Sequence, residues 1–123
     1  MNPWLVVSAV NGFLAVAFGA FAAHGLAARL DAQALQVFET GARYHMYHAL
    51  ALGIAAIAMR GAAAAAFQTA AIFFLIGIVL FSGSLYLLAL TGFRQLGIVT
   101  PFGGLAFLIG WAALAWAGTK VVM

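Results

Sequence analysis

The residues that could do chemistry are concentrated at positions 39–48, which read ETGARYHMYH. This stretch holds a carboxylate, a guanidinium, two imidazoles and two phenols, in a chain that is 67% hydrophobic and only 6% charged. Histidine changes its charge between pH 5 and 8 and binds metals, so His45 and His48 suit a proton relay or a metal site. Glu39 and Arg43 have the i,i+4 spacing of a favourable ion pair on a helix.

The chain has few of the groups on which catalysis depends. It contains no cysteine, which excludes thiol catalysis, thiolate metal sites and disulfides. The only carboxylates are Asp31 and Glu39, so a Ser–His–Asp set is lacking and acid–base chemistry would have to rest on Glu39 and a histidine. We therefore expect no enzymatic activity.

Metal or haem binding would need more histidines than this stretch provides. His24 follows the first apolar segment and could complete a three-histidine site with His45 and His48, but the i,i+3 spacing of the last two does not specify a metal. Haem ligation would need a second deep histidine on another helix. We expect no metal and no other cofactor, bound lipid excepted, and we expect His24 to cap its own helix.

The composition places the chain in a membrane. Soluble domains carry about 25% charged residues, and no soluble core could hide this much apolar surface. The net charge of +3 comes from five basic and two acidic residues spread singly, so nucleic-acid binding is not indicated. The length allows a single domain, residues 1–123.

The apolar segments predict an all-α integral membrane protein, a bundle of four transmembrane helices at about 3–24, 32–59, 62–90 and 101–119. Four crossings put both termini on the same side of the bilayer, and the few basic residues do not decide which side. Gly25, in a left-handed conformation, is expected to end the first helix, and Asp31 to cap the second. Thr100 and Pro101 read as the start of the fourth helix.

Other features concern how the helices bend and pack. Ser82-Gly83-Ser84 is the expected place of a bend in the third helix. Small residues form stripes that let helices approach closely, on the first helix (Ser8, Gly12, Ala15, Gly19, Ala22) and on the fourth (Ala106, Gly110, Ala113, Ala117).

A helical wheel places the polar residues of positions 39–48 on different faces of the helix. With Glu39 at 0°, Arg43 and Tyr47 lie within about 80° on the same face, whereas His45 lies near 240° on a face of small residues. His48, one turn after Tyr44, lies near 180° and about 18 Å along the axis from Arg60, close to the middle of the bilayer. The polar residues of other helices could extend these histidines into a polar path (Asn11, Ser82, Ser84, Tyr86). Alternatively, their hydroxyls bond to backbone and join helices.

Four segments together resemble a known family. They are GAFAAHGL at 19–26, FETGARYHMYHAL at 38–50, FSGSLY at 81–86 and TPFGG at 100–104. In this order and spacing they resemble domain-of-unknown-function family 423, small bacterial membrane proteins whose eukaryotic relatives are called transmembrane protein 256. His45 departs from the pattern, since many relatives have Gln there. The resemblance implies a multi-pass protein of the bacterial inner membrane and brings no activity with it.

Two functional hypotheses remain open. The first is a non-enzymatic scaffold or accessory subunit that forms a homo-oligomer or docks to a larger membrane complex, because polar groups face more than one way. The alternative is a channel or carrier for protons or a small solute that uses Arg43, His45 and His48.

Overall fold

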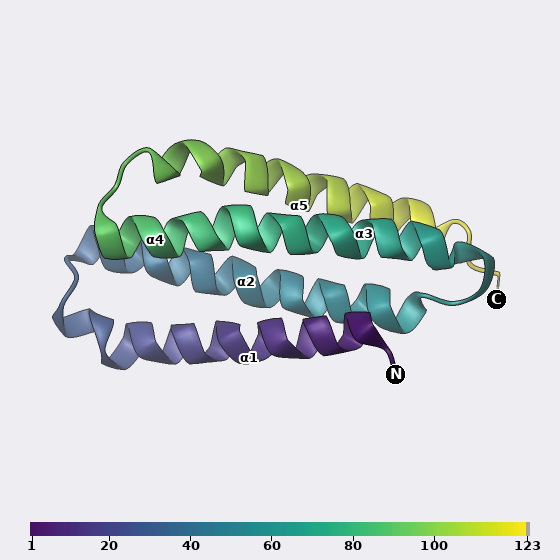
Figure 1. The fold of residues 1–123 in the computed structure, drawn as a ribbon, viewed down its shortest axis with the longest axis horizontal. Coiled ribbons are helices and arrows are strands. Elements are labelled where there is room, and N and C mark those ends of the chain that lie inside the picture. The colour runs from purple at the N-terminus through teal and green to yellow at the C-terminus, as the bar shows by residue number, and fades with distance from the viewer. Residues whose placement is uncertain (123) are drawn as a thin grey trace.

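The computed structural model describes residues 1–122, and every regular element in that range is helical (Figure 1). This confirms the predicted all-helical bundle. The elements in order are α1 (Pro3–His24), η1 (Leu26–Ala28), α2 (Ala32–Ala58), η2 (Gly61–Ala63), α3 (Ala64–Gly77), η3 (Ile78–Ser82), α4 (Gly83–Thr91) and α5 (Leu96–Gly118). Because η2, α3, η3 and α4 follow one another without a break, they form one long helix, and the bundle has four.

The helix ends follow from local chemistry, although two of them differ from the prediction. Asp31 caps α2 as predicted, since its carboxylate accepts a hydrogen bond from the Ala34 amide at 2.7 Å. Gly92 ends α4 with φ +71°, a left-handed conformation that favours glycine. The prediction for Gly25 is wrong in its conformation: this residue has φ −88°, and its N–H still bonds to the Phe21 carbonyl at 2.8 Å.

The predicted start of the last helix at Thr100 and Pro101 is also wrong, because α5 begins at Leu96. The helix starts with a 3₁₀-type turn, in which each amide bonds to the carbonyl three residues before it. The first of these bonds joins the Leu96 amide to the Phe93 carbonyl at 3.1 Å. Pro101 therefore lies inside α5, where its missing N–H removes a single bond near the helix start.

The long helix changes its winding next to the predicted bend. Residues Ile78–Ser82 form a π-helical turn, in which the Gly83 amide bonds back to the Ile78 carbonyl. Such turns insert one extra residue into an α-helix. The irregularity thus ends at Ser82, where the predicted Ser82-Gly83-Ser84 bend begins.

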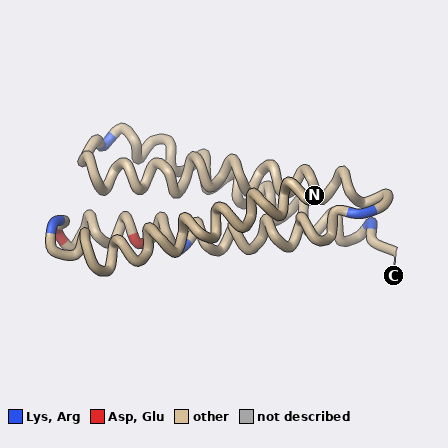
Figure 2. The backbone as a smooth tube through the Cα atoms, turned by 60° about the horizontal axis from the view of Figure 1, so that its bottom comes forward, with Lys and Arg blue, Asp and Glu red and all other residues tan. Residues whose placement is uncertain are grey.

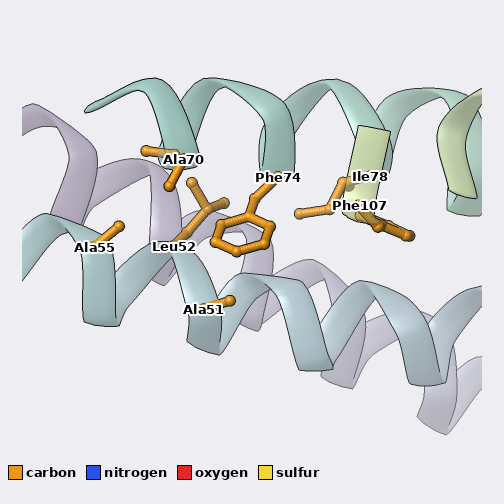
Figure 3. Close-up of a cluster of buried hydrophobic side chains, with 8 residues drawn as sticks. Ala51, Leu52, Ala55, Ala70, Phe74, Ile78 and Phe107 are labelled. Carbon is orange, nitrogen blue, oxygen red and sulfur yellow. The ribbon is translucent and has the colours of Figure 1, made fainter. Parts of the chain in front are cut away.

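The helices pack in the order α1, α2, the long helix and α5, so α2 and the long helix are in the middle of the bundle. α1 packs against α2, α2 against α3 and α4, and α5 against α3 and η3, while the start of α1 and the end of α5 lie at the same end of the bundle (Figure 1). The main core cluster joins Leu52 of α2 to Phe74 of α3 and Phe107 of α5, with small alanines between them (Figure 3).

Three helical stretches are long and apolar enough to cross a membrane: Pro3–Ala28, Gly61–Thr91 and Leu96–Gly118. α2 has sufficient length, 27 residues, but it is not among them, since it carries the polar stretch. Most charged positions lie toward the ends of the bundle, with a pair of opposite charges further along the tube (Figure 2).

Candidate functional site

His45 joins three helices by hydrogen bonds. Its Nδ1 lies 2.9 Å from the Tyr86 hydroxyl on α4, and its Nε2 lies 2.9 Å from Oδ1 of Asn11 on α1. The Asn11 amide nitrogen in turn donates to the Val7 carbonyl at 2.9 Å. With 3% of its surface exposed, His45 is buried between α1, α2 and α4, on the inward face that the helical wheel indicated.

The chemistry of these partners determines where the His45 proton is. The Asn11 oxygen can only accept, so His45 Nε2 carries the hydrogen and donates to it. Nδ1 then has a free lone pair and accepts from the Tyr86 hydroxyl. The result is a directed chain of donors from Tyr86 through a neutral His45 and Asn11 to the Val7 carbonyl.

His48 is held in the opposite tautomer by a different helix. The indole N–H of Trp111 on α5 donates to His48 Nε2 at 3.0 Å, and an indole can only donate. The hydrogen of His48 is therefore on Nδ1, which donates to the Tyr44 carbonyl of its own helix at 2.7 Å. The ring stacks on Phe107 with centroids 3.5 Å apart and planes at 7°.

In this structure the lone pair of each imidazole accepts a hydrogen bond. The lone pair of His45 is engaged by Tyr86, and that of His48 by Trp111. His24 is exposed at the end of α1 and does not join them. In the part of the chain that the structure describes, no group of three potential metal-binding side chains comes together.

The residues of the possible polar path form separate contacts between helices, which we call joints. Asn11 and Tyr86 reach His45, but Ser82 Oγ donates to the Gly41 carbonyl of α2 at 2.7 Å. Ser84 Oγ bonds to the Phe81 carbonyl at 2.9 Å and lies 2.6 Å from Thr100 Oγ1 on α5. Both serine hydroxyls thus bond to backbone, and each also links its own helix to another one.

Glu39 and Arg43 lie on the opposite, outward face of α2. Both side chains are exposed, and within residues 1–122 neither takes part in a hydrogen bond or in an ion pair shorter than 4.0 Å. The structure therefore does not show the pair that their spacing predicts. Tyr47 and Leu50 continue the same face and are 50% and 61% exposed.

A shallow groove of about 380 Å³ runs between α2 and α5 beside His48. Aromatic rings form most of its walls, among them Tyr44, Tyr47, Phe107 and Trp111. The groove is open at the surface of the bundle, and its walls are mainly apolar.

The chain is similar to known proteins over nearly its whole length. Residues 18–104 match the model of a family described as "Protein of unknown function (DUF423)". The UPF0382 membrane protein YwdK of Bacillus subtilis is 45% identical over 121 residues, 98% of each chain. The UPF0382 inner membrane protein YgdD of Escherichia coli K12 is 43% identical over 110 residues, 89% of this chain and 84% of the relative. The chain belongs to the DUF423 family.

Membership confirms the resemblance that the sequence segments indicated, and this DUF423 protein is a multi-pass protein of the bacterial inner membrane. The family description and the names of these relatives give a location and no activity. No solved structure matches the chain.

Sequence reasoning missed Trp111 and Phe107, which complete the surroundings of His48. The signal was available for Trp111, because an indole N–H away from the membrane interface needs an acceptor. Stacking of Phe107 had no such signal, since phenylalanine is common in any apolar helix. Both lie outside residues 18–104, the part that matches the DUF423 model, as does Asn11.

Proposed function

We propose that this DUF423 protein is a non-enzymatic accessory subunit that assembles with another transmembrane helix through the outward face of α2. The observation that carries the proposal is the exposure of Glu39 and Arg43, which have no partner within the described chain. A charge at the lipid surface is costly unless it reaches the headgroups or pairs with an opposite charge. A partner helix would supply that charge.

The inward side of α2 supports the non-enzymatic part of the proposal. Both histidines have their two ring nitrogens engaged by neighbouring residues, and Asp31 serves as a helix cap. Glu39 and the histidines lie on different faces of α2, so they do not form an acid–base pair. We propose no catalysis and no metal, haem or quinone, with lipid in the groove between α2 and α5.

The test is the native mass of the protein in a mild detergent. We expect wild type to run as a complex larger than its 12.8 kDa chain, and the Arg43→Ala variant to dissociate. Arg94→Ala is the matched control, because it removes an exposed arginine from the connection before α5 and should leave the complex intact. A wild-type monomer that copurifies with no other protein would overturn the proposal.

The alternative, a channel or carrier based on Arg43, His45 and His48, gives a different expectation in liposomes. The donor chain through His45 ends at the Val7 carbonyl, and His48 bonds back to its own helix, which favours a structural role for both. We expect proton flux with the wild-type protein to equal that of empty liposomes. A flux that His48→Ala abolishes would establish the alternative.

A further inference from the structure

We propose that the partner on α2 is a second copy of this chain, with Glu39 of each copy bound to Arg43 of the other. The inference rests on the proposed function and names its partner. Its starting point is that the two unpaired charges on the outward face of α2 are opposite in sign and one helical turn apart.

A surface with one positive and one negative charge can be complementary to itself. A twofold axis places the same patch of both subunits in contact, so residue i meets j while j meets i. Two copies inserted in the same orientation can share such an axis only along the membrane normal, which makes the two α2 helices parallel. The pair of Glu39 and Arg43 then occurs twice in each dimer.

The depths of the two residues fit this arrangement. Arg43 lies four residues after Glu39, about 6 Å further along the axis. Side chains of a helix lean toward its N-terminus, so the guanidinium of Arg43 is directed back toward the level of the carboxylate on the neighbouring helix. The planar guanidinium can bind a carboxylate through two parallel hydrogen bonds.

The remainder of the face suits a helix. Below the charges it continues with Tyr47, Leu50, Ile54 and Ile57, which are 50–61% exposed. Arg43, Leu50 and Ile57 recur every seven residues, the repeat of two parallel helices that cross with a left-handed twist. The aliphatic part would pack against its copy while the charges fix the register.

Two other occupants would leave different signatures. A different membrane protein would need its own fixed charges opposite Glu39 and Arg43. A lipid headgroup could bind Arg43 but would not use the seven-residue repeat. Both are outcomes of the experiment below.

The experiment uses charge reversal in two differently tagged copies, coexpressed and then copurified in mild detergent. Glu39→Arg gives a face with two positive charges, and Arg43→Glu gives one with two negative charges. Each variant alone should lose self-association, with a dimer dissociation constant raised more than about tenfold, because like charges meet. Together they should pair, and the double swap of both residues in one chain should dimerise as wild type does.

The outcomes separate this inference from the proposed function. Pairing of the two single variants shows that both fold, and it supports the inference. If wild type instead purifies with another protein, and the mixed variants do not pair, the second copy is the wrong partner. If wild type is a monomer with no other protein bound, whether or not it carries lipid, the proposed function fails as well. Arg94→Glu, a reversal away from this face, should have no effect.

Discussion

His45 and His48 are three residues apart on α2, both are buried, and yet they belong to different joints. His45 is the middle of a chain of side-chain hydrogen bonds that links α4, α2 and α1. His48 receives one bond from α5, returns one to its own helix and stacks on Phe107. Their tautomers are opposite, because the partner of Nε2 is an acceptor for His45 and a donor for His48.

The difference shows what each joint depends on. Loss of the His45 ring would leave the Tyr86 hydroxyl and the Asn11 carbonyl oxygen without their partners inside the bundle. Loss of the His48 ring would affect mainly one indole and an aromatic stack, since the Tyr44 carbonyl lies within a helix. The contact of α1 with α2 at His45 therefore depends on hydrogen bonds, whereas the contact of α5 with α2 at His48 depends mainly on the packing of aromatic rings.

The largest effect is expected from a change that separates α5 from the long helix. A Cβ at Gly103 would clash with the Phe81 backbone nitrogen, and backbone atoms cannot rotate away as a side chain can. Gly103→Ala should therefore displace α5, with Phe107 and Trp111, from His48. We expect a loss of about 3 kcal/mol in the free energy of unfolding.

Unfolding in mixed micelles by sodium dodecyl sulfate, followed by tryptophan fluorescence, measures this loss. Gly104→Ala is the matched control, because its Cβ would come no closer than 3.9 Å to the Phe81 ring, an ordinary contact. Equal stability of the two variants would show that the α5 joint does not depend on close packing.

The polar joint is tested by replacing His45. His45→Leu keeps an apolar side chain of similar size but leaves two buried polar groups unpaired, and we expect a loss of about 2 kcal/mol in the same assay. His45→Gln keeps one donor and one acceptor, so it should recover most of that loss. If the leucine variant is as stable as wild type, the donor chain does not hold α1 in place.

The sequence predicted which face of a helix a residue occupies better than it predicted the hydrogen-bond partners of that residue. Apolar length predicts the four helices, and the helical wheel places His45 and Arg43 on different faces, in agreement with the burial of the first and the exposure of the second. These features depend on composition and on the geometry of one helix. The link from Asn11 to Tyr86 depends on the register between three helices, which no local pattern determines.

Local patterns also failed where packing decides. Thr100 and Pro101 resemble a helix start, but the turn before Leu96 begins α5, and Thr100 lies beside Ser84 instead. Small residues on α5 lie against α3, where a Cβ at Gly110 would meet the Phe74 ring at 2.6 Å. On α1, by contrast, a Cβ at Gly12 or Gly19 would meet nothing within 4 Å, so these two members of the predicted stripe do not mark a contact.

The smallest loss of stability is expected from a change at Trp111. This change is also the most direct test of whether the surroundings of His45 and His48 are independent. Trp111→Phe keeps an aromatic ring at a half-exposed position and removes one hydrogen bond to His48, so we expect a loss of about 1 kcal/mol. Nitrogen-15 chemical shifts of the imidazoles should place the wild-type hydrogen on Nε2 of His45 and on Nδ1 of His48. In the variant only the His48 signals should move, because the donor chain through His45 does not include α5. Identical tautomers in the wild type, or a shift of the His45 signals, would mean that the two joints are not independent.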